Sequence, residues 1–583
     1  NPKQTWNIIR EVIGGKPIQE IPHSFNINNT TVSDNGLICN AFNNFFLNIG
    51  PSIDATIPST NVDPIDYIHN DVHESIFLSP VDTTELRTTI KAFDNKSPGI
   101  DGISALPIKA AVEAILEPLT YILNLSFLNG TFPSELKQAK IIPIFKKGAR
   151  EELNNYRPIS ILPFFSKIFE KLMCQRMFNY FSNHNIITPF QFGFQPKRNT
   201  TQALLCATHS IVSAMERGDA TVGVLLDFQK AFDTVQHSIL INKLSKYGIR
   251  GAPLNWVRDY LSNRVQQVCI RETMSSAGTI TCGVPQGSIL GPLLFLIYIN
   301  DITSVSNSLK FILFADDTNV FISGHDIHDV FRNLNSQMKK VSKWLRANRL
   351  MLNLSKTNYM LFSPTNRFRN NYELFIDNTL ISRVHTATFL GVVLDENLKW
   401  NHHIQRVRGK ISRTIGIFHK LSKFFPQNIL RTLYYSLVYP HLTYGIEVWG
   451  NAASVHTLPL FRLQKKIVRI ICMSNYRAPS EPLFNELQLL TLSKIYKYRV
   501  LFLMYKFVNN ALPPLFDGMF SYSNTPHYNV RHVPPLQIPF YRLEISRRCI
   551  MYQGATLWNH YYAYFHGASS YIFKKKVKIL LFN

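Results

Sequence analysis

The chain has 583 residues, with 62 lysines and arginines against 38 aspartates and glutamates, so its formal net charge is +24. A chain of this length has material for three or more domains, each with its own core. Residues 401–583 hold 24 of the basic residues and only five of the acidic ones, which places +19 of the charge in the last third. This basic excess favours a polyanionic partner, most simply nucleic acid, with a membrane surface as the weaker alternative.

Other features exclude several classes of protein. The apolar run at residues 289–299 is too short to span a bilayer and contains a glycine and a proline, and no signal peptide is visible. The seven cysteines show neither a Cys-x-x-Cys motif nor the Cys/His spacing of a zinc finger. This favours reduced thiols over disulfides or structural zinc. Because the first residue is asparagine rather than methionine, we expect a fragment or partial reading frame.

The first part of the chain contains little recognisable chemistry. Residues 1–80 mix short helical patterns with spacers rich in asparagine, serine, threonine and proline, which predicts an N-terminal extension or linker. Residues 96–102 form a turn-rich loop with two glycines. Such a loop either approaches another chain closely or simply caps a helix.

A strand with cations at its end follows at residues 140–147, and the chain returns at residues 156–160. Arg157 on the return could bind triphosphate oxygens in bidentate fashion. Lys146 could also bind phosphate, or it could lie in an ordinary solvated turn.

Residues 191–201 combine aromatic rings, glycine and cations before another helical pattern. Aromatic stacking together with phosphate-directed cations is typical of single-stranded template binding. This predicts a nucleic-acid contact made by Phe192, Phe194, Lys197 and Arg198. Packing of the two rings into a core is an alternative that does not exclude the first.

The apolar run at residues 221–226 ends at Asp227. Apolar residues at helical spacing then predict a helix over residues 228–244, which Gly248 would close. On its own, Asp227 would be interpreted as the N-cap of that helix.

Residues 281–288 read Thr-Cys-Gly-Val-Pro-Gln-Gly-Ser and lead into an apolar helix over 289–301, with Ser288 as its expected N-cap. Gln286 offers an amide for an incoming nucleotide or template backbone, and Gly287 permits close approach. An ordinary turn is the alternative.

Residues 309–322 place two β-prone runs on either side of Asp316 and Asp317, which predicts a hairpin with carboxylates at its tip. Adjacent acids at a turn are usually solvated. Together with Asp227 at the end of another strand, however, they suggest a cage for a hard cation such as Mg²⁺.

Three motifs now carry a resemblance: Asp-Phe-Gln-Lys-Ala-Phe-Asp at 227–233, Gly-Val-Pro-Gln-Gly-Ser at 283–288 and Phe-Ala-Asp-Asp at 314–317. In this order they resemble the reverse transcriptase of a non-LTR (LINE-type) retrotransposon of the jockey/CR1-like group. The resemblance implies a mixed α/β (α+β) right-hand polymerase with fingers, an antiparallel-sheet palm and a helical thumb. The expected segments are an extension at 1–80, fingers at 81–220, a reverse transcriptase domain at 137–395 with its palm mainly at 221–395, a basic thumb at 396–520 and a basic C-terminal segment at 521–583.

The resemblance also implies an activity and roles for single residues. The expected reaction is nucleotidyl transfer by an RNA-directed DNA polymerase, with two Mg²⁺ ions (or Mn²⁺) held by Asp227, Asp316 and Asp317. Phe232, five residues after Asp227, would exclude a 2′-hydroxyl and so select deoxynucleotides, while Asp233 is expected to be structural. Lys356 resembles a lysine that protonates the leaving pyrophosphate, although a solvated lysine is the alternative.

Later segments fit the same scheme. An amphipathic stripe predicts a helix over 327–345 under the sheet, and residues 388–394 resemble a primer-gripping hairpin. Cations interleaved with tyrosines suit a thumb that holds a hybrid duplex by its phosphates, and the expected contacts there are Arg406, Arg408, Lys465 and Lys466. Residues 554–559 resemble the C-terminal end of the proteins of this retrotransposon group, but no chemistry can be assigned to them.

The expected partners are element RNA as template, a nicked target DNA as primer and deoxynucleoside triphosphates, with no membrane. The endonuclease would come from an upstream region absent from this chain. Action in the nucleus after a cytoplasmic ribonucleoprotein stage is the expected localisation. A decayed or domesticated copy that binds nucleic acid without catalysis is one alternative, and a maturase or telomerase-like relative is another.

Overall fold

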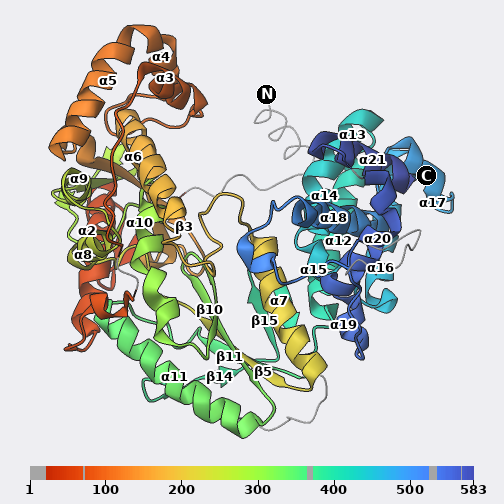
Figure 1. Cartoon of the computed structure of the whole chain (residues 1–583). Coiled ribbons are helices and arrows are strands. Elements are labelled where there is room, and N and C mark those ends of the chain that lie inside the picture. Colours follow the sequence, from red (N-terminus) through yellow and green to blue (C-terminus); the bar gives the residue numbers. More distant parts are fainter. Residues whose placement is uncertain (1–20, 70–71, 364–371, 524–534, 566, 583) are drawn as a thin grey trace.

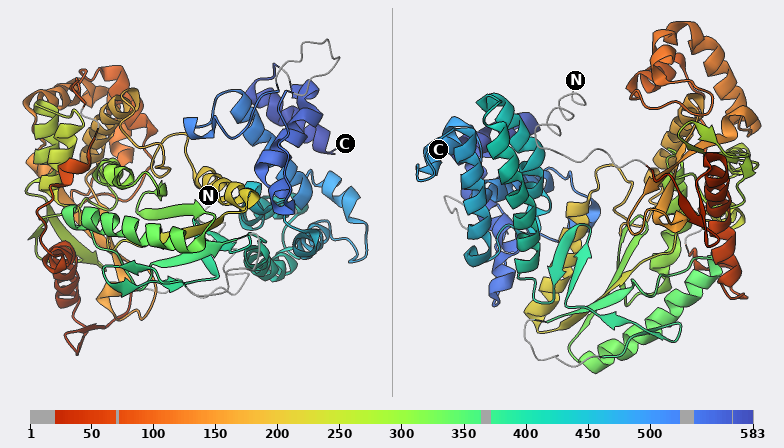
Figure 2. Two further views of the ribbon diagram at one scale, coloured as in Figure 1. Left: turned by 60° about the horizontal axis from the view of Figure 1, so that its bottom comes forward. Right: turned by 180° about the vertical axis from the view of Figure 1, so that it is seen from behind.

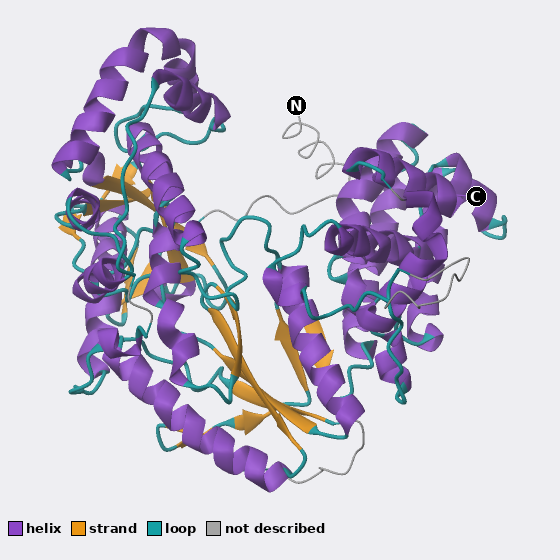
Figure 3. Cartoon of the chain, viewed as in Figure 1, coloured by secondary structure: helices purple, strands orange, loops and turns teal. Residues whose placement is uncertain are grey.

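The computed structural model describes residues 21–69, 72–363, 372–523, 535–565 and 567–582. A first lobe, drawn mainly in red to yellow-green at the left of Figure 1, and a second lobe, drawn in cyan to blue at the right, stand on either side of a central β-sheet (Figures 1 and 2). Helices dominate both lobes, and the strands gather in the sheet between them and within the first lobe (Figure 3). This arrangement confirms the predicted mixed α/β polymerase fold.

The central sheet has the strand order β14-β11-β5-β10-β9. Its central pairs, β11–β5, β5–β10 and β10–β9, are all antiparallel, and only the short edge strand β14 is parallel to its neighbour. The bounds are β5 Ala220–Leu226, β9 Lys310–Phe314, β10 Asp317–Gly324, β11 Asn358–Phe362 and β14 Ser382–Arg383.

Both faces of this sheet are buried. Alternate residues of a strand point to opposite faces, and each set of side chains lies in a different core. Val222 and Val320 belong to the core shared with α11 (Ile327–Ala347). Phe321 and Met360 face the other way, into the core shared with α7 (Thr200–Arg217) and the second lobe. The predicted amphipathic helix under the sheet is confirmed as α11, since its apolar stripe is buried.

A second sheet lies in the first lobe, with the order β4-β3-β6-β7 and β8 paired to β6. Its strands are β3 Gln138–Phe145, β4 Tyr156–Ile161, β6 Val265–Ile270, β7 Thr273–Met274 and β8 Gly278–Thr279. Helix α2 (Asn35–Thr56) packs on β6, and its Phe42 is fully buried against Tyr156. This part of the expected extension or linker therefore contributes to a core, while residues 1–20 lie outside the described residues.

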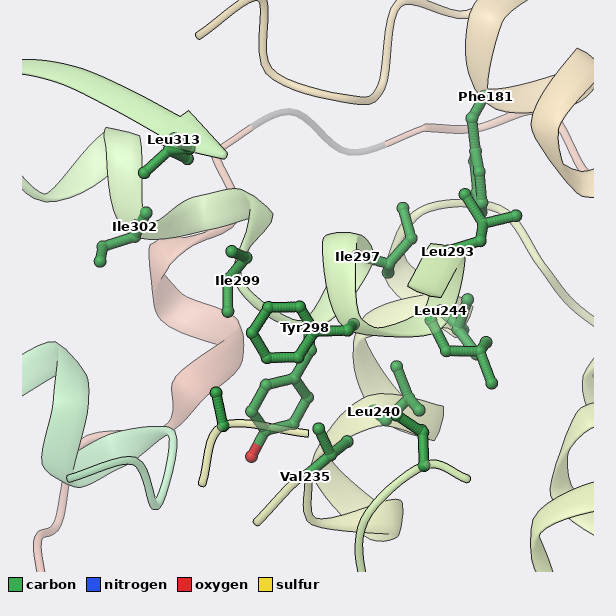
Figure 4. Packing of buried hydrophobic residues seen from close by; sticks show 14 of the residues in the cluster. Phe181, Val235, Leu240, Leu244, Leu293, Ile297, Tyr298, Ile299, Ile302 and Leu313 are labelled. Carbon is green, nitrogen blue, oxygen red and sulfur yellow. The ribbon is translucent and has the colours of Figure 1, made fainter. Parts of the chain in front are cut away.

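The remaining elements of the first lobe are mostly helices. Their core around Tyr298, Leu240 and Leu244 is shown in Figure 4. The bounds are β1 Phe25–Ile27, β2 Thr30–Val32, α3 Thr83–Ala92, α4 Ala105–Ala110, α5 Val112–Asn129, α6 Phe164–Asn183, α8 His237–Lys246, α9 Ala252–Leu261 and α10 Gly291–Tyr298.

Two helix predictions were wrong at their N-terminal ends. The helix expected from 228 begins only at His237, so Asp227 is not a helix N-cap. The preceding residues form turns instead, since the carbonyl oxygens of Phe232 and Val235 accept bonds from the 283–284 loop. The apolar helix expected from 289 begins at Gly291.

The second lobe starts with the predicted hairpin, β15 (Thr386–Phe389) and β16 (Val392–Asp395), with Gly391 at a φ of +81° in its turn. Helices of the expected thumb and C-terminal segment then share one core, in which Trp558 and Phe573 pack with Val500. The bounds of its helices are α12 Asn401–Leu421, α13 Gln427–Leu437, α14 Tyr439–Thr443, α15 Ile446–Trp449, α16 Ser454–Ile471, α17 Ser480–Glu486, α18 Leu492–Val508, α19 Glu544–Arg548, α20 Ile550–Phe565 and α21 Ser570–Phe582. Before this lobe, the short hairpin of β12 Phe375–Ile376 and β13 Thr379–Leu380 packs on α11.

Across the described ranges, no helix has the length and apolar character needed to cross a bilayer.

Candidate active site

The predicted acidic hairpin is formed by β9 and β10, which pair Phe314 with Asp317 across a two-residue turn. Ala315 opens this turn at a φ of +56°. Strand β10 also pairs with β5, and Thr318 lies opposite Leu226. Extending this register by one residue places Asp317 opposite Asp227, so the two side chains leave the same face of the sheet. The structure thus brings the separate acidic motifs to one end of the sheet.

The three carboxyl groups influence one another electrostatically. Desolvation is the main cause that raises the pKa of Asp317 to about 6, followed by the charges of Asp316 and Asp227. Desolvation also raises the pKa of Asp316, with Asp227 adding to the rise and Arg157 opposing it. The side chains of Asp316 and Asp317 nevertheless reach solvent. The raised pKa values therefore reflect, first, carboxyl groups that are partly removed from water and, second, the negative charge that the acids share.

Lys356 lies beside the first carboxylate. Its Nζ is 3.4 Å from Oδ2 of Asp227 in an ion pair that is half exposed. The loop that carries Lys356 is tied to the same strand end, because the backbone N–H of Asn353 donates to the carbonyl of Asp227 at 2.7 Å. Within the part of the chain that the structure describes, no three His, Cys, Asp or Glu side chains are grouped closely enough to hold a metal ion. The acids therefore share one electrostatic site without forming a closed cage.

Cations from the first lobe approach these acids. Strands β3 and β4 form the predicted hairpin, from which Lys146 and Arg157 are exposed. Burial is the main cause that lowers the pKa of Lys146, and the positive charges of Arg157 and Lys356 lower it further, while Asp227 opposes them. Cations that belong to different elements thus lie close enough to repel one another beside the carboxylates. This suits a polyanionic ligand such as a triphosphate, whose binding by these residues stays a prediction.

Gln286 and Gly287 have intramolecular partners. Nε2 of Gln286 donates to Oδ1 of Asp233 at 2.7 Å, and the Gln286 carbonyl accepts from the N–H of Ser160 at 2.8 Å. Gly287 has a φ of +131°, and a Cβ there would collide with the carbonyl oxygen of Ser160. The loop is therefore pinned between β4 and Asp233, which fits the structural role expected for Asp233. Contact of Gln286 or Gly287 with a nucleotide stays a prediction.

A buried acid that the sequence did not reveal supports the same loop. Glu170 on α6 is fully buried, and its Oε2 accepts from the backbone N–H groups of Ile289 at 2.6 Å and Leu290 at 3.2 Å. Ser288 also accepts from Gly291 through its hydroxyl, at 3.0 Å. Burial raises the pKa of Glu170. Glu170 is far from the loop in sequence, so no local pattern could indicate the contact.

The aromatic loop at 191–201 divides into buried and exposed parts. Phe192 is only 1% exposed, and Arg198 lies over its ring while donating to the carbonyl of Gln191 at 2.9 Å. The covered ring fits the alternative in which Phe192 packs into the core, while contact of Phe192 and Arg198 with nucleic acid stays a prediction. Phe194, which is 56% exposed, and Lys197 remain accessible.

Phe232 lies next to this loop. Its ring stacks on Phe295 with 4.4 Å between ring centroids and meets Phe194 edge-on at 6.3 Å. The side chain is half-buried. Phe295 thus supports one face of the ring and restricts its movement.

The cations expected in the thumb are mainly at the surface. Arg406 and Arg408 are exposed on α12, and Arg406 donates to the hydroxyl of Thr388 in the β15–β16 hairpin at 3.3 Å. On α16, Lys466 is exposed, while Lys465 lies 4.8 Å above the ring of Phe461. A basic helical surface therefore adjoins the hairpin, although its contact with a duplex stays a prediction.

Comparison with known proteins defines the class to which this fold and site belong. Residues 144–394 match the family described as reverse transcriptase (RNA-dependent DNA polymerase). The matched region includes the β9–β10 hairpin, Lys146, Arg157 and all three acids of the site. Residues 144–394 are therefore a reverse transcriptase domain, and the chain is similar to the polymerases of non-LTR, LINE-type retrotransposons.

The relatives support this narrower assignment. The probable RNA-directed DNA polymerase from transposon X-element of Drosophila melanogaster is 30% identical over 424 residues, which cover 71% of this chain and 46% of that protein. The RNA-directed DNA polymerase from mobile element jockey of the same species is 31% identical over 422 residues, covering 70% and 45%. The probable RNA-directed DNA polymerase from its transposon BS is 28% identical over 445 residues, covering 74% and 49%. The chain spans about half the length of the curated relatives it matches.

Proposed function

We propose that this chain is the RNA-directed DNA polymerase of a non-LTR retrotransposon, which adds deoxynucleotides to a DNA 3′ end opposite an RNA template. The observation that supports this most is the placement of Asp227 beside the Asp316–Asp317 turn, with Lys146 and Arg157 approaching from the opposite hairpin. Nucleotidyl transfer requires acidic side chains that hold cations and positively charged side chains that bind phosphates.

The donor set fits divalent cations. Carboxylate oxygens are the ligands that Mg²⁺ and Mn²⁺ prefer. Desolvation is the main cause of the raised pKa values of Asp316 and Asp317, and the charges of neighbouring carboxylates add to it; a bound cation would relieve that added repulsion. Two such ions, held by Asp227, Asp316 and Asp317, would activate the primer 3′-oxygen and neutralise charge on the triphosphate.

The remaining roles fall to side chains around the acids. Lys146 and Arg157 bind the triphosphate, with Arg157 able to engage two oxygens at once. Lys356, which is 3.4 Å from Asp227, gives a proton to the leaving pyrophosphate. Phe232 blocks a 2′-hydroxyl, and Gln286 with Gly287 forms the wall behind the incoming nucleotide.

The partners follow from the same proposal. Element RNA is the template, a nicked chromosomal target is the primer, and the nick is made by an endonuclease encoded upstream of this chain. The exposed cations Arg406, Arg408 and Lys466 hold the hybrid duplex by its phosphates. The protein acts in the nucleus after assembly with its RNA in the cytoplasm.

Replacing Asp316 with Asn tests the proposal. Asn keeps the size of the side chain but removes the charge that binds a cation, so we expect primer extension on poly(rA)/oligo(dT) to fall by at least about 10³-fold while RNA affinity changes less than about twofold. The matched control is Asp329→Asn, which neutralises an exposed acid on α11.

Unchanged extension by Asp316→Asn would refute the assignment of the site. Wild-type protein that binds RNA but extends no primer in Mg²⁺ or Mn²⁺ would instead identify a nucleic-acid-binding protein without catalysis.

A further inference from the structure

The segment before Phe194 lies directly against the turn between β9 and β10, which carries Asp316. Gln191 forms a parallel bridge with Leu313 of β9. The N–H of Phe192 donates to the Leu313 carbonyl at 2.8 Å, and the Leu313 N–H donates to the carbonyl of Phe190 at 3.0 Å. The loop thus extends the sheet by one short bridge, on the outer side of the strand that carries the acidic turn.

The side chain of Gln191 reaches past this bridge into the turn. It is 1% exposed, and its Oε1 accepts from the backbone N–H of Ala315 at 2.9 Å and from that of Gly193 at 2.8 Å. Ala315 holds the left-handed conformation that L-residues rarely adopt, at a φ of +56°. One carboxamide oxygen therefore fixes the backbone of the residue immediately before Asp316.

Gly193 makes the close approach possible. A Cβ at this position would collide with the backbone nitrogen of Ala315 and lie 2.9 Å from the carbonyl carbon of Phe314. The φ of Gly193 lies outside the left-handed region, so alanine would not strain its own backbone. A side chain at position 193 is thus excluded by the contact with the turn and not by the backbone conformation of Gly193.

We propose that Gln191 is a positioning residue for Asp316 and that Gly193 is the contact point through which it acts. This inference rests on the proposed polymerase function and deepens it. The same loop exposes Phe194 and Lys197 on its outer side, so one short segment joins the surface expected to bind template to the carboxylate expected to bind cation. Neither residue contacts substrate in this role, and both act through the backbone of Ala315.

The first test replaces Gln191 with Met, which is similar in size but lacks the acceptor, and with Glu, which keeps it. Nε2 of Gln191 is buried without a partner, so the change to Glu removes no hydrogen bond. For Gln191→Met we expect amide hydrogen exchange at Ala315 to accelerate at least tenfold. We also expect kcat for primer extension to fall at least tenfold and the Mg²⁺ concentration for half-maximal activity to rise several-fold, with template–primer Kd within twofold. Gln191→Glu should restore kcat to within a few-fold of wild type.

A purely structural role would lower the folded fraction without changing the Mg²⁺ requirement, which separates it from positioning. The inference is overturned if Ala315 exchanges at the wild-type rate in Gln191→Met, or if Met and Glu impair kcat equally. If the wild-type protein fails to extend primers, the proposed function falls, whereas the exchange comparison still decides whether Gln191 holds the turn.

Gly193→Ala gives an independent test, because its Cβ must displace the turn. The matched control is Gly416→Ala on α12, where an added Cβ meets no atom within 4 Å. We expect Gly193→Ala to reproduce the loss of kcat and the higher Mg²⁺ requirement, and Gly416→Ala to leave both unchanged. Wild-type values for Gly193→Ala would contradict the role of this contact.

Discussion

At the scale of single residues, Phe232 shows how a core contact can serve selectivity. Its ring stacks on Phe295 and is half-buried, so it has little freedom to move aside for a larger substrate. In the proposed active site, a fixed ring next to the ribose would exclude a 2′-hydroxyl by contact. This makes sugar selection depend on both the presence of the ring and its support.

Replacing Phe232 with Val should therefore admit ribonucleotides. We expect the ratio of kcat/KM for dNTP over rNTP to fall by roughly 10–100-fold, because one steric contact in a pocket contributes discrimination of that order. Single-nucleotide primer extension with each substrate measures it, and extension with dNTP by the same variant is the internal control. Undiminished discrimination would remove Phe232 from the sugar contact.

At the scale of elements, a buried histidine joins α12 to the β15–β16 hairpin. His403 is 3% exposed, and its Nδ1 accepts from the N–H of Val393 at 3.2 Å. Burial is the main cause that lowers the pKa of His403 to about 4, and the charges of Arg406 and Lys410 lower it further. The folded protein thus keeps a neutral ring here, whereas an unfolded chain binds a proton near pH 6.5.

This difference predicts acid sensitivity in the second lobe. Above pH 6.5 the stabilisation is fully present, and it is lost progressively as pH falls from 6.5 toward 4, since only the unfolded state takes up the proton. At pH 5 the loss amounts to roughly 2 kcal/mol. Melting temperatures at pH 7 and pH 5 should differ less for His403→Gln than for wild type. The control is His325→Gln, which changes an exposed histidine. An equal change in melting temperature between pH 7 and pH 5 for wild type and His403→Gln would contradict the role assigned to His403.

At the scale of the whole molecule, Glu216 joins the C-terminal segment to the end of α7, a helix that packs against the central sheet. Its carboxylate accepts from the hydroxyl of Ser546 at 2.6 Å and from the backbone N–H of Leu543 at 3.2 Å. A further bond comes from the N–H of Arg542 at 2.5 Å. One acid therefore satisfies the start of α19 and joins it to α7, which lies more than 300 residues earlier in the chain.

Glu216→Ala should loosen this connection. Three donors lose a charged acceptor, at a cost of roughly 1.5–3 kcal/mol for a bond of this kind, so we expect faster hydrogen exchange over residues 542–549. We also expect shorter products per binding event, while incorporation of the first nucleotide is nearly unchanged. The control is Glu544→Ala, which removes an exposed acid from α19. Equal product lengths for both variants would show that the connection does not position the second lobe.

The sequence by itself determined the local chemistry of this protein. The strand that leads to Asp227, the hairpin that presents Asp316 and Asp317, and the amphipathic helix α11 all follow from periodicity and turn composition within a short window. The class of polymerase followed from the order of three such motifs. These features were predictable because each depends on residues adjacent in the chain.

Only the tertiary structure decided which side chains remain accessible and what holds the acids in place. Phe192 and Phe194 look alike in sequence, but one is buried in the core and the other is exposed. Glu170 and Gln191 support loops more than a hundred residues away, and the helix expected after Asp227 gives way to turns that pair with another loop. Contacts between distant segments depend on how whole elements pack, and no local period or composition encodes that packing.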